Sequence, residues 1–473
     1  MAAQVDVLVV GAGPSGLALG VDLARRGVDA LVVERADGLS PGSRGKGLQP
    51  RTLEVFHDLG VLDAIRAAGG TYPVGMVWRD GRRVGEYRMF DAPEATEGVP
   101  FDEPWMVPQW RTQEILLARL RELGGRVAFR REAVGLAQDG DGVTVYFADG
   151  TELRARYAVA ADGGRSTVRR ALGVGMVGEA VDPFPALVAD VRITGLDRDN
   201  WHFFPGGEGA GGGEVAGGGE GGDRLMAICP LAGTEDFQLV ARFPEGTAVD
   251  LSPDAVRDLV AARSHLRRED VNEVRWTSDF RPRAALADRF RAGRVLLVGD
   301  AAHVHSPAGG QGLNTGVQDV YNLGWKLGAV LRDGAPASLL DTYEEERRPI
   351  AAGVLRLSRS VHRGETRRGG ATRQLGLGYR TSSLTEETRG NPGPVRAGDR
   401  APDATVNGLR LFDAFRGPHW TLLTADADVA RVYGAGVFLI RPDGYVGWAG
   451  ETPEGLAEYV GRVGAEGAYR TLG

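Results

Sequence analysis

Apolar and polar positions along the chain follow several periods, and the first of them predicts a βαβ unit. Residues 5–10 form a short, β-branched apolar run, which is typical of a buried parallel strand. Residues 17–27 have helical spacing and end at a glycine, and the apolar run 30–35 predicts a second strand. A strand, a helix and a strand in this order predict two parallel strands joined by a crossover helix.

Later segments predict both helices and antiparallel strands. Residues 74–90 have the pattern of a β-hairpin, and residues 107–124 have that of a helix. From about 173 to 284, short alternating strands with proline and glycine breaks predict a mostly antiparallel region. The segments 321–334 and 338–362 predict two long helices.

Two further stretches complete the pattern. Residues 206–222 are rich in glycine, and we interpret them as a flexible hairpin loop, with a mobile lid over a substrate entrance as the alternative. Near the end, the apolar runs 419–425 and 436–450 predict strands, the second turned at residues 442–444. The end of the chain therefore predicts a small α/β unit of its own.

Composition narrows the class of protein. A chain of 473 residues is too long for one compact core, and its formal charge of −7 gives no basic surface for nucleic acid. Its one cysteine, Cys229, excludes an internal disulfide and a Cys-rich metal cluster, which suits a reducing cytoplasm. There is no signal-peptide pattern and no apolar run of about 20 residues. We expect a cytoplasmic protein without nucleic-acid or membrane partners.

The most specific motif lies inside the first βαβ unit. "GAGPSG" places Gly11, Gly13 and Gly16 between strand and helix, and Glu34 ends the next strand. Gly11 allows a tight turn, Gly13 lets a pyrophosphate approach the backbone, and Gly16 lets helix and strand pack closely. The helix N-terminus favours the phosphates.

Glu34 selects among the nucleotides that such a motif can bind. Its carboxylate can accept hydrogen bonds from both ribose hydroxyls of an adenosine and would repel a 2′-phosphate. The motif therefore predicts a primary FAD or NAD site and not an NADP site. Within it, we also take Pro14, Ser15 and Arg35 as cofactor contacts.

Three other motifs follow at a distance. Arg44, in "SRGKGLQPRTLE", lies in a glycine-rich loop from which a guanidinium could reach phosphate oxygens. Asp162, in "ADGGRSTVRRALG", follows a predicted strand. Asp300 ends the apolar run of "GRVLLVGDAAHVHSPAGGQGLNTGVQDVYNLGWKLG" and is followed by small residues that lead into a helix.

In this order and spacing, the motifs resemble those of the class A flavoprotein monooxygenases, the para-hydroxybenzoate hydroxylase-like aromatic hydroxylases. The likeness covers roughly residues 5–350 and also includes "VPQWRTQE" and "LLDTYEEERRP". It is strongest for the actinobacterial branch that acts on polyketides, antibiotics and phenols. The last segment resembles the thioredoxin-like tail of many such enzymes, but it has no Cys-x-x-Cys, which favours a role in packing or in a homodimer.

The resemblance implies an α/β fold with three units. A Rossmann-type FAD-binding domain of the glutathione-reductase-like GxGxxG kind is expected beside a mostly antiparallel substrate domain and a thioredoxin-like C-terminal domain. The expected boundaries are 1–72, 100–172 and 285–365 for the FAD-binding domain, 73–99 and 173–284 for the substrate domain, 366–394 for a linker, and 395–473 for the C-terminal domain.

The resemblance also implies roles for single residues. Asp300 would bond the ribityl and pyrophosphate part of FAD, Gln109 the ribityl chain, and Arg44 the pyrophosphate. Asp162 would belong to an Asp-Gly element, with Arg165 nearby, that serves FAD and the nicotinamide cofactor. Around the isoalloxazine, the backbone after Pro307 would approach the ring and the following helix would direct its N-terminal dipole at it. The residues assigned there are Pro307, Gly310, Gly312, Leu313 and Asn314.

The implied reaction is hydroxylation of an aromatic or polyketide-like small molecule with NADPH or NADH and O2, through a C4a-hydroperoxyflavin. Baeyer–Villiger oxygenation and a non-redox cyclisation that uses FAD as a scaffold remain alternatives, and consumption of reduced nicotinamide separates the last of these. A halogenase is disfavoured because no W-x-W-x-I-like motif follows the first βαβ unit.

No catalytic side chain can be assigned from the sequence. His303 and His305 form a His-x-His pair, but no third metal ligand is evident, which favours a structural or flavin-adjacent role. The aromatic cluster 201–204 favours core packing over acid–base chemistry. The only two lysines, Lys46 and Lys326, each lie beside a motif.

Overall fold

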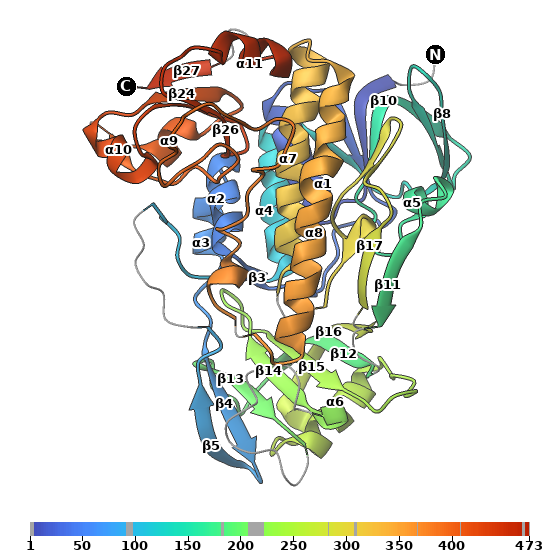
Figure 1. The fold of residues 1–473 in the computed structure, drawn as a ribbon. Coiled ribbons are helices and arrows are strands. Elements are labelled where there is room, and N and C mark those ends of the chain that lie inside the picture. Colours follow the sequence, from blue (N-terminus) through green and yellow to red (C-terminus); the bar gives the residue numbers. More distant parts are fainter. Residues whose placement is uncertain are drawn as a thin grey trace.

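A computed structural model describes most of the chain. It describes residues 4–90, 98–180, 184–206, 222–281, 283–306, 310–366, 368–406, 408–465 and 469–472. In Figure 1, the helices α7 and α8 run side by side through the middle of the molecule, between the antiparallel sheet at the bottom and the C-terminal unit at the top.

The sheet that carries the first motif is mostly parallel. Its order is β18-β19-β10-β1-β2-β7, with β9 pairing the first half of β10 and β8 pairing β9. The strands are β1 (Gln4–Val10), β2 (Ala30–Val33), β7 (Arg126–Ala128), β8 (Ala133–Gln138), β9 (Val143–Phe147), β10 (Glu152–Ala160), β18 (Arg291–Ala292) and β19 (Val295–Leu297). Because β1 pairs in parallel with β2, the predicted βαβ unit is confirmed.

Helices cover this sheet and join it to the rest of the molecule. They are α1 (Pro14–Arg25), α2 (Pro50–Leu59), α3 (Leu62–Ala67), α4 (Gln109–Glu122), α5 (Thr167–Ala171), α7 (Gly312–Arg332) and α8 (Asp341–His362). α1 packs against α7 and α4. The long helix predicted over 321–334 begins nine residues earlier, at Gly312. No helix of the described residues is long and apolar enough to cross a membrane.

The second large sheet is antiparallel except where β13 meets β4. Its order is β16-β12-β15-β14-β13-β4-β5. The strands are β4 (Val74–Arg79), β5 (Arg82–Tyr87), β12 (Ala186–Ile193), β13 (Asn200–Phe204), β14 (Met226–Pro230), β15 (Phe237–Arg242) and β16 (Val271–Phe280), and α6 (Pro253–Arg263) packs on them. The hairpin predicted over 74–90 is confirmed. Of the glycine-rich segment 206–222, residues 207–221 lie outside the described residues.

Smaller sheets connect the two large ones. The first has the order β11-β17-β20, built from β11 (Met176–Ala180), β17 (Arg283–Ala287) and β20 (His303–Val304). The second pairs β3 (Gly47–Leu48) with β6 (Trp105–Met106). This short pair lies where the loop before α2 meets the segment before α4, so it positions residues of both predicted motifs.

The C-terminal unit is a five-stranded sheet of order β21-β26-β25-β24-β27. Its elements are β21 (Glu386–Glu387), β22 (Thr405–Val406), β23 (Leu409–Arg410), α9 (Leu411–Phe415), β24 (Trp420–Thr424), α10 (Ala427–Tyr433), β25 (Val437–Ile440), β26 (Val446–Gly450), α11 (Leu456–Val463) and β27 (Tyr469–Leu472). β21 comes from the segment 366–394, which was expected to be only a linker, and it pairs with β26. The segment 366–394 therefore contributes a short strand to this sheet.

A buried charge cluster fixes this unit to the long helices. Glu346 on α8 accepts hydrogen bonds from Lys326 on α7 at 2.7 Å and from both terminal nitrogens of Arg441 at 2.6 and 2.9 Å. Asp443 binds Arg441 and also accepts from the indole nitrogen of Trp325 at 3.1 Å. These charges are paired and hydrogen-bonded, as burial requires. Lys326, one of the two lysines of the sequence, thus supplies a buried positive charge for Glu346.

Candidate cofactor and substrate site

The three glycines of "GAGPSG" differ in what an added Cβ atom would meet. A Cβ on Gly11, where φ is +110°, would lie 2.3 Å from the Ala161 carbonyl oxygen, and one on Gly16 would lie 1.9 Å from that of Gly11. Contacts within the protein therefore require both glycines. A Cβ on Gly13 would meet nothing within 4 Å. The protein leaves open space at this glycine, at the N-terminus of α1, where a pyrophosphate would lie.

Glu34 lies beside the same loop. Its carboxylate accepts hydrogen bonds from the backbone N–H of Ala12 at 2.9 Å and of Ala36 at 3.1 Å. Since each carboxylate oxygen can accept more than one hydrogen bond, lone pairs remain for ribose hydroxyls. Pro14 occupies the first turn of α1, and Arg35 is exposed next to Glu34.

Ser15 joins this motif to the segment around Asp300. A Cβ on Gly299 would lie 2.8 Å from the Ser15 hydroxyl oxygen, and one on Gly316 would lie 2.5 Å from it. The turn of α1, the 3-10 helix η4 (Gly299–Ala301) and the first turns of α7 are thus packed directly together. Motifs almost 300 residues apart in the sequence meet at one edge of the parallel sheet.

Asp300 is exposed at this meeting point. Nearby protein atoms displace part of the water around its carboxylate, and this desolvation raises the pKa of Asp300. The attraction of His303 and Arg44 acts in the opposite direction. A Cβ on Gly312 would lie 3.9 Å from the Asp300 carboxylate, so the N-terminus of α7 is close. Arg44 donates to the Ser278 hydroxyl at 3.2 Å, on the antiparallel sheet. Arg44 thus lies between the two large sheets.

Gln109 and Asn314 hold the loop that contains Arg44. Gln109 accepts from the backbone N–H of Gly45 at 3.1 Å. Asn314 accepts from the N–H of Gln49 at 2.8 Å and donates to the Gly47 carbonyl at 2.9 Å. Loop 43–49 is therefore fixed between α4 and the start of α7.

The remaining predicted residues lie close to this arrangement or outside the described residues. The Leu313 side chain would lie 3.6 Å from a Cβ on Gly45, and Asn314 donates to the Gly310 carbonyl at 2.8 Å. Asp162 follows β10 beside Gly11 and caps α5 by accepting from two backbone N–H groups; its other oxygen is buried without a hydrogen-bond partner among the described residues. Arg165 is exposed. Pro307 lies outside the described residues.

A buried hydrogen-bonded chain that the sequence did not reveal lies behind Asp300. His305 binds His303 at 2.8 Å, His303 binds Asp319 at 2.5 Å, and Arg347 donates to Asp319 at 2.8 Å. Burial lowers the pKa of His305 well below its usual value, which favours the neutral ring. The signal in the sequence that could have revealed this chain is Asp319, a charged residue on the largely buried helix α7. No group of side chains that could hold a metal ion was found among the described residues. The structural or flavin-adjacent role expected for the pair stays a prediction.

The imidazole of His202 is held by a partner at each ring nitrogen. Its Nδ1 accepts from the Trp78 indole at 3.1 Å, and its Nε2 is 2.9 Å from the Asp197 carbonyl oxygen. Both ring nitrogens are used, and burial lowers the pKa of the imidazole. The prediction of core packing for this cluster is consistent with these contacts.

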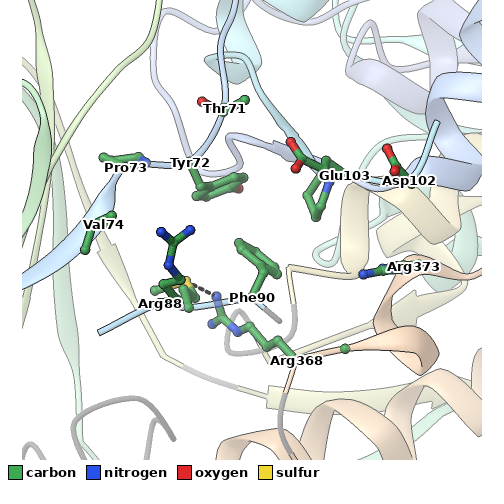
Figure 2. A pocket seen from close by; sticks show the side chains of 13 residues that line it. Thr71, Tyr72, Pro73, Val74, Arg88, Phe90, Asp102, Glu103, Arg368 and Arg373 are labelled. Carbon is green, nitrogen blue, oxygen red and sulfur yellow. Dashed lines mark hydrogen bonds between the residues drawn. The ribbon is translucent and has the colours of Figure 1, made fainter. Parts of the chain in front are cut away.

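A cavity of about 260 Å³ lies beside Tyr72 and Phe90 (Figure 2). The Tyr72 hydroxyl lies against Gly47, where a Cβ would be only 2.1 Å away. Arg373, in η7 (Gly370–Arg373), and the two residues before η7 form part of the wall. A hydrogen bond from Gln311, the N-cap residue of α7, to the Thr372 carbonyl at 3.1 Å ties η7 to that helix. The lining includes Tyr72, Arg88, Phe90, Asp102, Glu103, Arg368 and Arg373. The cavity is thus connected to the cofactor edge through the loop and through α7.

These residues fit an FAD. The open side of Gly13, the remaining lone pairs of Glu34 and the exposed carboxylate of Asp300 all lie along one edge. The unpaired oxygen of Asp162 lies beside Gly11. An elongated nucleotide needs a phosphate cradle, a ribose acceptor and an acceptor for hydroxyl groups, and this edge offers each of them.

Comparisons with known proteins agree with this fit. Residues 4–358 match the family described as the FAD binding domain. A flavin-dependent monooxygenase of Mycobacteroides abscessus is 45% identical, over 97% of this chain and 99% of that protein. A rifampicin monooxygenase of Streptomyces venezuelae is 33% identical, over 95% of this chain and 97% of that protein.

A solved structure is similar over almost the whole chain. It is that of aklavinone-11 hydroxylase in a ternary complex with FAD and aklavinone, with a TM-score of 0.80, 29% identity, and coverage of 97% of this chain and 98% of that one. The mixed α/β fold is therefore that of FAD-dependent monooxygenases, and the resemblance stated from the sequence is confirmed. The chain belongs to the FAD-binding-domain family and is a flavoprotein monooxygenase.

Proposed function

We propose that this monooxygenase consumes NADH or NADPH and O2 to hydroxylate an aromatic, polyketide-like natural product. The names of its relatives support this substrate class, since they include rifampicin monooxygenase and 12-dehydrotetracycline 5-monooxygenase/anhydrotetracycline 6-monooxygenase, the latter from Streptomyces rimosus and 39% identical over 75% of this chain and 69% of that protein. The cavity beside Tyr72 and Phe90 supports it independently, because aromatic side chains form part of its wall.

The observation that carries the proposal is the position of loop 43–49. Its Gly47 and Gln49 are bonded to Asn314 at the cofactor edge, and Gly47 also lies against Tyr72 in the cavity wall. A substrate in the cavity would thus be one loop away from the flavin end of the cofactor. Such a site positions the reactants and excludes water, while the cofactor supplies the chemistry.

The residues have separate tasks in this proposal. Gly13 and the N-terminus of α1 bind the pyrophosphate, Glu34 the ribose, and Asp300 the ribityl region. The N-terminus of α7, from Gly312, would favour negative charge on the isoalloxazine of a bound FAD. Bound FAD would accept a hydride from NAD(P)H and activate O2 at its C4a position. We keep the cofactor contacts predicted from the sequence as part of this proposal.

We also propose the domain boundaries given above, with one adjustment. The FAD-binding domain combines 1–72, 100–172 and 285–365, and the substrate domain combines 73–99 and 173–284. The C-terminal unit has a packing role in this proposal, because its Arg441 and Asp443 bind the cluster around Glu346. Since β21 belongs to its sheet, the unit includes Glu386 and Glu387.

The test follows the oxidation of NAD(P)H and the uptake of O2 by the FAD-loaded protein, with and without fused-ring phenols. Oxidation that a phenol stimulates, with a hydroxylated product, is expected. An oxygenated ester from a ketone would point to Baeyer–Villiger chemistry instead. If no compound lets NAD(P)H reduce the bound FAD, the hydroxylase proposal is wrong, and a non-redox use of the cofactor as a scaffold becomes the better explanation.

A further inference from the structure

The cavity beside loop 43–49 is aromatic and rich in positive charge. Tyr72 and Phe90 pack edge to face, with ring centres 4.9 Å apart. The lining arginines, Arg88, Arg368 and Arg373, outnumber its carboxylates. In Figure 2, Arg88 and Arg368 approach the Tyr72–Phe90 pair from one side, and Asp102 and Glu103 lie on the other. One side of the aromatic pair is thus a cationic wall.

A further cation, Lys46, is connected to this wall through Trp201, and Lys46 itself is not among the residues that line the cavity. Its ammonium lies 4.3 Å from the ring centre of Trp201, and the Trp201 ring centre lies 6.2 Å from that of Tyr72. A cation over an aromatic face is a favourable arrangement. Trp201 is thus shared between Lys46 and the cavity wall.

Lys46 is also held in place by hydrogen bonds. Its ammonium donates to the side-chain oxygen of Gln238, whose amide nitrogen donates to the Ser43 carbonyl. The second bond fixes the orientation of the Gln238 amide, so its oxygen faces Lys46. An ammonium has three donors, and this contact uses one of them.

No carboxylate of the described chain forms an ion pair with Lys46. The carboxylate of Asp190, on β12, attracts the Lys46 ammonium, and the guanidinium of Arg368 repels it. Burial lowers the pKa of Lys46, which means that its charged form gains from an anionic partner. The indole nitrogen of Trp201, on whose ring Lys46 lies, is buried without a hydrogen-bond partner among the described residues. The surroundings of Lys46 thus favour a ligand with oxygen atoms.

We propose that Lys46 and Arg368 form the anion-recognising end of the substrate site, which binds an ionised oxygen of a fused-ring phenol or enol whose rings pack against Tyr72 and Phe90. Arg368 lines the cavity and lies over the Phe90 ring at 6.0 Å. Lys46 lies one side chain further in, on Trp201. The ionised oxygen pairs with the two cations, and its proton leaves to solvent.

This inference rests on the proposed function, because it assigns the cavity to the substrate of that reaction. It adds a chemical requirement that the reaction alone does not impose: the substrate carries an acidic hydroxyl at one end. A neutral aromatic ring would satisfy the aromatic wall and leave Lys46 unpaired.

The test measures binding of alizarin, a dihydroxyanthraquinone whose visible absorbance shifts to longer wavelength when a hydroxyl ionises. Its dimethyl ether, which cannot ionise, is the control ligand. Both are titrated into the FAD-loaded, full-length protein without NAD(P)H. The variants are Lys46→Met, Lys46→Arg and Arg368→Met, and Arg82→Met on the exposed strand β5 is the matched control for the loss of a surface arginine. FAD content is measured for each.

The wild-type protein is expected to bind alizarin about tenfold or more tightly than the ether and to show the spectrum of the anion. Lys46→Met and Arg368→Met lose that preference and that spectrum, whereas Lys46→Arg and Arg82→Met keep both. Equal binding of the two ligands, no binding of either, or an unchanged preference in Lys46→Met would overturn the inference. Loss of preference in Lys46→Arg as well would assign the effect to packing, which also counts against it.

The two proposals can fail separately. A protein that prefers alizarin but never oxidises NAD(P)H with any aromatic would refute the proposed function and leave the anion site standing. A protein that hydroxylates an aromatic but binds the ether as tightly as alizarin would do the reverse.

Discussion

Asn314, in the first turn of α7, bonds the backbone of Gln49 with its side-chain oxygen at 2.8 Å, across 265 residues of sequence. Its amide nitrogen donates to the carbonyls of Gly47 and Gly310. One side chain thus holds the loop of Lys46, the start of α7 and Gly310 together. The geometry of the cofactor edge depends on this amide.

Asn314→Ala should weaken FAD binding and destabilise the protein. The N–H of Gln49 and the carbonyl of Gly47 would lose their partner, which costs on the order of 2 kcal/mol. FAD affinity, measured by fluorescence titration of the apoprotein, should fall about tenfold. Gln318→Ala, one turn further along the same helix, serves as the control. Unchanged FAD affinity in Asn314→Ala would show that the loop is held by other contacts.

The glycines of the first motif should separate folding from cofactor binding. Gly13→Ala places a Cβ in open space, so the apoprotein should lose about 1 kcal/mol or less, while FAD affinity falls about tenfold or more. Gly16→Ala forces a Cβ against the Gly11 carbonyl and should cost the apoprotein at least about 2 kcal/mol. Thermal unfolding of both apoproteins measures the difference. Equal stability of the two would contradict the packing described here.

Much of this edge could be predicted from the sequence because its determinants are local. Gly11, Gly13, Gly16 and Glu34 have fixed positions within one βαβ unit, and the backbone geometry of that unit brings them together. Asp300 was recognisable for a similar reason, as a carboxylate at a strand end. Local spacing is enough where one supersecondary unit makes the whole contact.

Contacts between distant segments were not predictable. The pairing of His303 with Asp319, the Lys46–Gln238 bond and the cavity wall from η7 depend on how α7, β15 and the segment after α8 pack in three dimensions. The segment 366–394 looked like a linker because its polar, glycine-rich sequence has no periodicity. Its role comes from tertiary contacts that override local pattern.

The buried charge cluster should respond unequally to loss of its members. Glu346→Gln leaves Lys326 and Arg441 without their shared carboxylate and should cost about 3–5 kcal/mol. Lys326→Met should cost less, about 1–2 kcal/mol, because Glu346 keeps both bonds to Arg441 and methionine fills a similar volume. Chemical denaturation of the two variants checks this order. A larger loss in Lys326→Met would mean that the lysine, and not the arginine, holds the carboxylate.

Stability should fall in acid partly through Asp319. Burial opposes its charge, yet His303 and Arg347 lower the pKa of this carboxyl from 3.8 to about 2. A lowered carboxyl pKa gives stability that is complete above the unfolded value and is lost as pH falls through the folded value. The contribution is about 2 kcal/mol, lost between about pH 4 and pH 2.

The apoprotein and its Asp319→Asn variant, unfolded by urea at about pH 5 and about pH 3, test this titration. Wild type should lose about 1 kcal/mol more than the variant over that interval, because only wild type has the carboxylate. Parallel losses in the two proteins would show that other groups dominate the acid response.

The fate of labelled oxygen distinguishes a hydroxylase from a protein that uses FAD as a scaffold. FAD-loaded protein is incubated with NAD(P)H, ¹⁸O₂ and an aromatic compound that stimulates NAD(P)H oxidation. The mass of the product is then measured by mass spectrometry. For the proposed hydroxylation we expect one ¹⁸O atom in each hydroxylated product, with nicotinamide consumed in equal amount. A converted compound without label and without nicotinamide oxidation would contradict it and assign the bound FAD a purely structural part.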